Sequence, residues 1–272
     1  MTALRGPHQQ HEPLPARVGI AARVLSLLDD PNTDVGQLVT AVAADPTFAA
    51  RVIGLANSSY YGLSGRVSTL NYAICVLGFQ TLRALAVSLA AGVGGRDSVP
   101  EGFWETAATS ATAASHIAPL FGAQSQDAFS VGLLHTIGSA VLHREQPVTR
   151  LCLPMPTNVD DQCEREREVY GVDHAVAGAQ LLTELKFPRH VCALVANHHH
   201  APLQDASPIA RTLYAARTIA DLALNPEPDR SRAEHTLRRL SEGSIGYQEM
   251  KQIALQVKEQ AVHLADGLHA VS

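Results

Sequence analysis

Apolar residues recur every three to four positions along most of the chain, the spacing that places them on one face of an α-helix. The first such stretch begins at Leu14, and its apolar positions include Val18, Ala21, Leu25 and Leu28. No segment shows the alternation of apolar and polar residues that is typical of a half-buried strand. The pattern therefore predicts an all-α protein with on the order of a dozen helices.

Polar and proline-containing breaks indicate where these helices begin and end. The segment "DDPNT" ends the first helix, and its last residue, Thr33, is a suitable N-cap for the second. Asp45 followed by Pro46 predicts a sharper start, because an acidic cap and a proline in the first turn suit the free amides there. The stretch "STLNYAICVLGFQTLRALAVSLAAG" predicts two helices, the first capped by Ser68 and ended near Gly78.

The segment "VGLLHTIGSAVL", residues 131–142, places a single histidine within an otherwise apolar, glycine-containing helical stretch. His135 lies at the edge of its apolar stripe and is followed by Thr136. Gly138 lies in the middle of that stripe, where the lack of a side chain allows another helix to approach closely.

Composition supports a helical core and limits the classes of partner. The chain has 272 residues, of which 46% are hydrophobic and only 5% aromatic, so the core consists mainly of Ala, Leu and Val. This length fits one large domain or two small, closely packed ones. The net charge of −5 argues against a general nucleic-acid or anionic-membrane surface.

Targeting signals and cysteine spacing favour a cytoplasmic protein without a membrane span. The amino-terminal "MTALRGPHQQHEPLPAR" has no apolar signal core, and no run of about 18 apolar residues is free of interruptions. Cys75, Cys152, Cys163 and Cys192 have no CxxC spacing, so we interpret them as reduced thiols.

Thirteen histidines occur in the chain, and several lie where a helix would direct them inward. The candidate metal ligands are His135, His174, His198, His199 and Asp221. Imidazole nitrogens suit iron, manganese or zinc, and packed helices can bring such side chains together. A hydrolytic two-metal site would also need a carboxylate to neutralise and bridge the ions.

Each candidate also has a simpler interpretation. His135 could hydrogen-bond a carbonyl or the threonine that follows it, and His174 could cap its own helix. Residues 198–200 could form a solvated helix end. Asp221 could form an ion pair with Arg217, which precedes it by one helical turn.

An ordered series of segments between about residues 14 and 225 resembles the HDOD domain, a catalytically degenerate relative of the HD and HD-GYP phosphohydrolases. The segments are "DPTFAARVIGLANSSYYG", "AICVLGFQTLRALAV", "FWETAATSATAASHIA", "VGLLHTIGSAVL", "EVYGVDHAVAGAQLLTELKFPRHVCALVANHH" and "ARTIADLAL". The resemblance implies an amino-terminal helical bundle packed against an HD-like helical core.

This resemblance also suggests a division of the chain. Residues 1–13 would form a disordered arm, 14–98 the amino-terminal helical subdomain and 99–225 the degenerate HD-like core. Residues 226–272 would add carboxy-terminal helices, and residues 14–225 together would form the HDOD unit.

The resemblance further implies that two ligands of the active relatives are missing. The first histidine of their series falls at Thr106, and the aspartate of the His-Asp pair falls at Thr136. The remaining positions match the candidates His135, His174, His198, His199 and Asp221. A hydroxyl brings no negative charge to a metal centre, so we expect no catalysis and no cofactor, with a single iron, manganese or zinc ion as the remaining possibility.

Three functions follow. The favoured one is a non-catalytic bacterial signal-transduction module that acts on a regulatory protein partner in trans. The second is a residual metal-dependent phosphohydrolase of nucleotides or cyclic dinucleotides. The third is a module that binds a nucleotide second messenger without hydrolysis, although the sequence has no glycine-rich phosphate loop to support it.

Overall fold

The computed structural model describes residues 16–92, 99–145, 159–203 and 205–269, and within these ranges it contains helices and turns but no strand. The predicted all-α fold class is thereby confirmed. The predicted disordered arm at residues 1–13 and the thiol of Cys152 lie outside the described residues.

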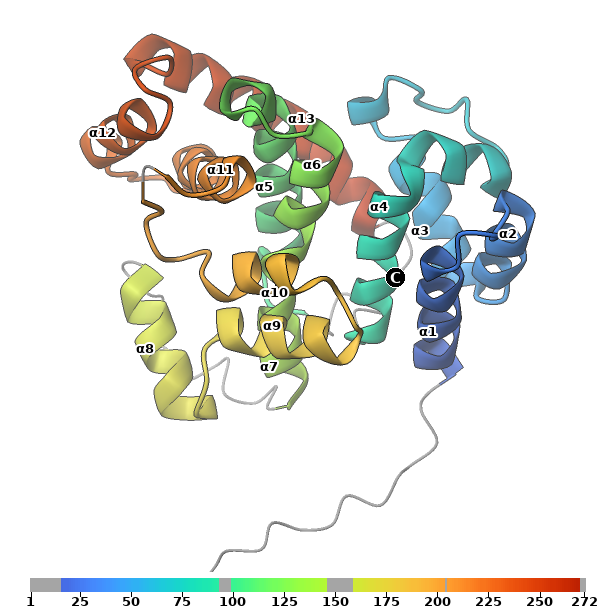
Figure 1. Cartoon of the computed structure of the whole chain (residues 1–272). Helices are drawn as coiled ribbons and strands as arrows, with labels where there is room; N and C mark the ends of the chain where they lie inside the picture. The colour runs from blue at the N-terminus through green and yellow to red at the C-terminus, as the bar shows by residue number, and fades with distance from the viewer. Residues whose placement is uncertain (1–15, 93–98, 146–158, 204, 270–272) are drawn as a thin grey trace, which may run out of the picture.

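Four helices form an amino-terminal bundle on one side of the molecule, coloured blue to cyan in Figure 1. They are α1 (Ala16–Asp29), α2 (Val35–Ala43), α3 (Pro46–Ala56) and α4 (Leu70–Ala90). A short 3₁₀ turn, η1 (Ser59–Tyr61), follows α3. Helix α4 packs against each of the other three, so it forms the inner wall of the bundle.

The helix starts agree with the predicted caps to within one residue. Asp45 caps α3 as predicted, and its carboxylate accepts hydrogen bonds from the amides of Thr47 and Phe48 at 2.8 and 3.1 Å. The cap of α2 is Asp34 rather than Thr33. Gln37 explains the difference, because it lies three residues after Asp34 and completes a reciprocal capping box with it.

Helix α4 bends where the sequence predicted a break. Gly78 adopts φ 75° and ψ 165°, and the Nε2 of Gln126 donates to the carbonyl of Leu77 at 3.0 Å across this kink. The first half is capped by Thr69 rather than Ser68. Among the described residues, α4 is the one helix long and apolar enough to cross a membrane, and two thirds of its apolar window is buried inside the protein.

The remaining helices form the core, in which the alanine-rich helix α5 is central. It packs against α6, α11 and α13, and small side chains permit these close contacts (Figure 1). The core helices are α5 (Phe103–Ile117), α6 (Ser125–Leu134), α7 (Ile137–Glu145), α8 (Val159–Tyr170), α9 (His174–Glu184), α10 (Arg189–Ala196), α11 (Pro208–Leu224), α12 (Arg230–Leu240) and α13 (Tyr247–His269), with the 3₁₀ turn η3 (Ala118–Phe121) after α5.

Helix α13 joins the two parts of the molecule. Val257, in its middle, belongs to an apolar cluster with α5, α11 and α12. Leu264 and Leu268, farther along, belong to the apolar cluster that contains the amino-terminal helices. The carboxy-terminal residues therefore take part in the core, and the proposed boundaries at residues 98, 225 and 226 stay predictions.

Candidate functional site

His135 lies at a joint between two helices rather than inside one. Helix α6 ends at Leu134 and α7 begins at Ile137, so the predicted single helical stretch over residues 131–142 is interrupted at this histidine. His135 is the C-cap residue of α6 and is only 2% exposed. Its Nδ1 lies 2.7 Å from the carbonyl oxygen of Gly132 and donates to it, which directs Nε2 away from the helix.

The two glycines at the crossing of α7 and α9 bring His135 and His174 to the same region. A Cβ atom on Gly138 would overlap the carbonyl of His174 and lie 2.6 Å from the amide nitrogen of Gly178. A Cβ atom on Gly178 would lie 3.1 Å from the amide of Gly138. The predicted close approach at Gly138 is therefore confirmed, and α9 is its partner.

His174 begins α9 and is fixed from α8. Asp173 caps the helix by accepting from the amide of Val176 at 2.9 Å, while Arg167 holds the same carboxylate in an ion pair at 2.6 Å. One oxygen of Glu166, Oε2, accepts from both the backbone amide and the Nδ1 of His174, at 2.8 and 2.6 Å. His174 therefore does not cap its own helix.

Glu166 is a functional residue that the sequence did not point to, because it lies in the highly charged segment "DDQCEREREVYG". A signal was present in the spacing. Cys163 and Glu166 are three residues apart and both buried, whereas Glu164 and Glu168 are exposed, so α8 has one inward face.

His198 and His199 follow the end of α10. The Nδ1 of His198 lies 2.5 Å from the carbonyl oxygen of Val195. The Nε2 of His199 lies 2.8 Å from the Nε2 of His174, and the Nδ1 of His199 lies 2.9 Å from a guanidinium nitrogen of Arg217 on α11. A second nitrogen of Arg217 donates to the carbonyl of His198.

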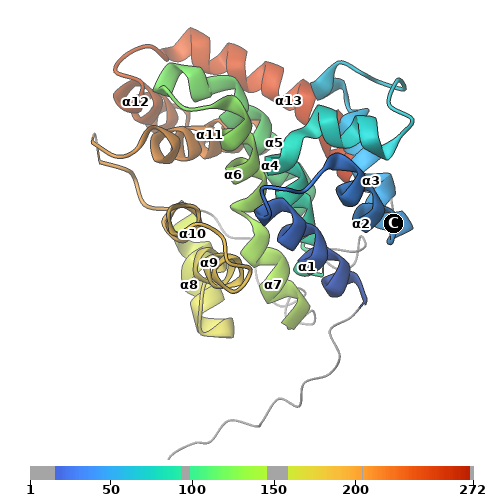
Figure 2. The ribbon, with the colours of Figure 1, turned by 45° about the vertical axis from the view of Figure 1, so that its right-hand side comes forward.

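The structure thus brings all four predicted histidines into one cluster, which we call the histidine cluster. The ring centroids of His198 and His199 are 4.0 Å apart, and those of His135 and His198 are 5.1 Å apart. His174 lies 5.2 Å from His198 and 4.7 Å from His199 by the same measure. Figures 1 and 2 place α8, α9 and α10, which surround the cluster, at the end of the core opposite α12 and α13.

Asp221 lies outside this cluster, which corrects the predicted ligand set. Its side chain is exposed, and its Oδ1 accepts from the side-chain Nδ2 of Asn225 at 3.4 Å. The predicted ion pair with Arg217 is also not formed, because the guanidinium turns inward to the cluster. Arg217 therefore has the inward position that the sequence suggested for Asp221.

The two threonines at the missing ligand positions differ in their surroundings. Thr136 is buried, and its hydroxyl has no hydrogen-bond partner among the described residues. His135 thus bonds a carbonyl rather than this threonine. Thr106 lies in the first turn of α5 and is partly exposed, and its assignment to the first histidine position stays a prediction.

The hydrogen bonds assign the protons of the cluster. Arg217 has only donors, so the Nδ1 of His199 that faces it must accept. His199 then carries its proton on Nε2 and donates to the Nε2 of His174. His174 in turn carries its proton on Nδ1 and donates to Glu166. Three hydrogen bonds thus link the side chains of Arg217, His199, His174 and Glu166, and all three are formed with both histidines neutral. We call this series the closed chain.

Burial and the charge of Arg217 keep His135, His198 and His199 neutral. Burial, followed by the nearby Arg217, lowers the pKa of His135 to about 3 and that of His199 to about 2. The same two causes hold the pKa of His198 well below its usual range. Burial alone would raise the pKa of Glu166, but its contacts with His174 bring that pKa below the ordinary value. Arg217 and Glu166 thus carry opposite charges at the two ends of this hydrogen-bonded series.

These residues do not fit a two-metal hydrolytic centre. Such a centre needs carboxylates to balance two cations, but Thr136 offers only a hydroxyl and Asp221 faces solvent. Glu166 is engaged behind His174, and Arg217 adds a positive charge. One smaller donor set exists among the described residues: Cys163, His174 and His199 each offer one atom within 4.8 Å of the others.

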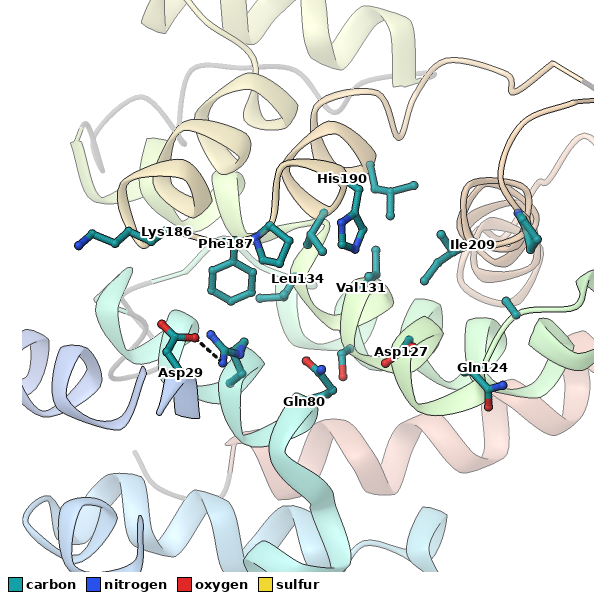
Figure 3. Close-up of a pocket in the computed structure, with 17 residues that line it drawn as sticks. Asp29, Gln80, Gln124, Asp127, Val131, Leu134, Lys186, Phe187, His190 and Ile209 are labelled. Carbon is teal, nitrogen blue, oxygen red and sulfur yellow. Dashed lines mark ion pairs between the residues drawn. The ribbon is translucent and has the colours of Figure 1, made fainter. Parts of the chain in front are cut away.

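A separate groove lies between the amino-terminal bundle and the core, with a volume of about 470 Å³. Figure 3 shows Val131, Leu134 and Phe187 at its apolar centre and Asp29 at its edge. Asp29 forms an ion pair with Arg83, another residue of the lining, at 2.7 Å. We call this the α4–α10 groove. Sequence analysis missed it because its walls come from α1, α4, α6, α10 and α11, which only folding brings together.

The architecture is that of an HD-like all-α protein, a helical bundle packed on a core with histidines at its helix ends. Within this class, residues 14–201 match the HDOD domain, and the chain belongs to the HDOD domain family.

Solved structures with the same fold come from several bacteria. A protein from Shewanella amazonensis SB2B, provisionally named a phosphohydrolase, has a TM-score of 0.69 at 24% identity, with 94% of each chain covered. An HDOD domain protein of unknown function from Geobacter sulfurreducens has a TM-score of 0.66 at 19% identity, covering 97% of this chain and 94% of that one. These two likenesses concern the fold alone.

Two further relatives are longer than this chain. A protein from Marinobacter aquaeolei VT8, provisionally named a signal transduction protein, has a TM-score of 0.63 at 26% identity, covering 93% of this chain and 59% of that one. An uncharacterized protein of Treponema pallidum (strain Nichols) is 25% identical over 206 residues, or 71% of this chain. This chain spans 39% of the length of that relative.

Proposed function

We propose that this protein is a non-catalytic HDOD module of cytoplasmic signal transduction that binds a regulatory protein partner in trans. The observation that carries the proposal is the closed chain from Arg217 to Glu166, in which the histidine nitrogens bond one another instead of facing a reactant. A hydrolytic two-metal site needs a carboxylate to balance its ions, and the carboxylate of the cluster, Glu166, is already engaged by His174. The likeness to a relative named for signal transduction supports the same class of function.

The α4–α10 groove is the surface that we assign to the partner. Its floor is apolar, while Asp127 and Lys186 add one charge of each sign to its rim. Such a groove suits a segment of a partner protein that inserts apolar side chains and carries both charges beside them. The groove is lined by residues of both the bundle and the core, so the affinity for a bound segment would depend on how the two are positioned.

Two groove substitutions and one control test this assignment. Leu194→Glu and Ile209→Glu place a carboxylate on the groove wall, where both side chains are only partly buried. Leu255→Glu is the matched control, because Leu255 is 56% exposed on α13, outside the residues that line the groove. A partner recovered with the wild-type protein, then purified and titrated by calorimetry, should bind the control normally and lose at least about tenfold in affinity for each groove variant.

Equal binding by the groove variants would reject this surface. The module interpretation itself fails if the purified protein hydrolyses a phosphodiester, such as a cyclic dinucleotide, after iron, manganese or zinc is added. A nucleotide that raises the melting temperature without being hydrolysed would instead support a sensing module, since a ligand that binds only the folded state stabilises it.

A further inference from the structure

We propose that Arg217 is the resident cation of the histidine cluster, and that its guanidinium excludes a zinc ion from a latent site formed by Cys163, His174 and His199. This inference does not depend on the proposed function. It concerns which cation the cluster accepts, whether or not the module binds a partner.

The donor set of this latent site is that of zinc rather than of a hydrolytic two-metal centre. Zinc prefers thiolate sulfur and imidazole nitrogen, at about 2.3 Å and about 2.1 Å. Cys163 on α8, His174 at the start of α9 and His199 after α10 offer one such atom each, all within 4.8 Å of one another. Glu166 already holds the Nδ1 of His174, as an outer carboxylate does behind a metal-bound histidine.

Arg217 blocks this site through the proton of His199. Because its guanidinium occupies the Nδ1 of His199, the histidine must carry its proton on Nε2. That proton is donated to the Nε2 of His174, so neither Nε2 lone pair is available to a metal. Zinc bound at these two nitrogens would require His199 to move its proton to Nδ1, and an N–H there can no longer accept from Arg217.

Charge acts in the same direction as the proton. The guanidinium bonds both His199 and the backbone carbonyl of His198, so it is fixed beside the three donors. A divalent cation close to a fixed positive charge is repelled strongly inside a protein, where the effective dielectric constant is low. Arg217 is thus a cation that the protein itself supplies, and its hydrogen bonds to His198 and His199 hold it in place.

Replacing Arg217 tests the inference. Arg217→Met removes the charge and the donors but keeps an unbranched chain, and it should bind one zinc ion per chain at least about tenfold more tightly than the wild type. Cys163→Ser added to Arg217→Met should abolish this gain, since it removes the thiolate. Arg211→Met is the matched control on the same helix, where Arg211 pairs with Glu242 outside the cluster, and its zinc affinity should equal that of the wild type.

Elemental analysis after dialysis gives the stoichiometry, and titration with cobalt reports the thiolate ligand through its sulfur-to-metal absorption. Folded Arg217→Met protein that binds no zinc overturns the proposal. So does a wild-type protein that binds zinc through Cys163 as tightly as the variant.

A measurement on the wild type keeps the test decisive if Arg217→Met does not fold. Nitrogen-15 NMR of the histidine rings distinguishes the two neutral tautomers. The proposal requires the Nε2–H form for His199 and the Nδ1–H form for His174, both unchanged by an equivalent of zinc. His199 in the Nδ1–H form would overturn it.

Discussion

The histidine cluster and the α4–α10 groove lie next to the same helix, α10, but they differ in how their polar groups are used. His198 and His199 follow the end of α10, and His199 bonds His174 on α9 and Arg217 on α11. His174 in turn bonds Glu166 on α8, so the cluster joins four elements of the core. Val191 and Leu194, within α10, line the groove together with exposed polar residues.

This difference separates two kinds of polar environment in one fold. In the cluster, buried donors and acceptors meet one another, and such closed networks stabilise a structure more readily than they act on a ligand. In the groove, apolar side chains lie open beside polar ones, which is the arrangement that binding surfaces have. The residues with the richest chemistry are thus not the ones that we assign to recognition.

Substitution at the crossing of α7 and α9, next to the histidine cluster, should cause the largest loss of stability. Gly138→Ala places a methyl group where the His174 carbonyl lies, and both neighbours are backbone that cannot rotate away. We expect the free energy of unfolding, measured by urea denaturation, to fall by about 3 kcal/mol. Gly19→Ala on α1, where an added Cβ meets nothing, should cause no loss. A tolerated Gly138→Ala would show that α7 and α9 are not in contact here.

Removal of the Glu166 carboxylate, which bonds His174, should cause the next largest loss of stability. Glu166→Ala leaves the backbone amide and the ring Nδ1 of His174 buried without an acceptor, and we expect a loss of about 2–3 kcal/mol in the free energy of unfolding. Glu166→Gln keeps an acceptor oxygen and should cost less. Glu164→Ala, at an exposed position of α8, should cost almost nothing. Equal losses for Ala and Gln would contradict the assigned hydrogen bonds.

Acid should destabilise the cluster while the groove contributes little. His135 and His199 have folded pKa values of about 3 and about 2, below the ordinary histidine value of 6.5. The unfolded chain therefore binds more protons below pH 6.5, and the stability that both groups give at neutral pH is lost as the pH falls towards their folded pKa values. Between pH 7 and pH 6 the free energy of unfolding should fall by on the order of 1–2 kcal/mol.

Urea denaturation at the two pH values, with a chelator present, checks this dependence. His190→Gln, which replaces an exposed histidine of the groove, should show the same fall as the wild type. His135→Gln should reduce the fall, because one of the buried histidines with a lowered pKa is then absent. A stability that rises on acidification would contradict neutral histidines in the folded state.

The smallest expected effect is a gain. The hydroxyl of Thr136 is buried and has no partner among the described residues, so it is desolvated without compensation. Thr136→Val replaces it with a methyl group of similar size and should stabilise the protein by about 1 kcal/mol, measured as the free energy of unfolding in urea. Ser130→Ala is the contrast, because its hydroxyl donates to the carbonyl of Gln126 at 3.0 Å, and it should not stabilise.

Much of the local structure followed from the sequence because its causes are local. Asp45 and Pro46 determine a helix start within three residues, and Gly78 marks the kink of α4. The caps at Asp34 and Thr69 were placed one residue too early, since the neighbouring hydroxyls of Thr33 and Ser68 are equally plausible without coordinates. The gathering of four histidines was also predicted, through the inward faces of their helices and a family resemblance.

What the sequence could not determine is which distant side chains meet. Arg217 and Asp221 are one turn apart on α11, and the sequence did not show which of them turns inward. The structure decides in favour of Arg217, because His199 and the carbonyl of His198 offer acceptors to its donors. Glu166 likewise gained a role only through its contact with the start of α9, and the groove exists only because α4 and α10 lie on either side of it. Sequence spacing determined the helices and their apolar faces, because these depend on residues a few positions apart. Only the tertiary structure decided that Arg217 faces the histidines, which ring nitrogens carry the protons and where the groove lies, because these depend on contacts between distant residues.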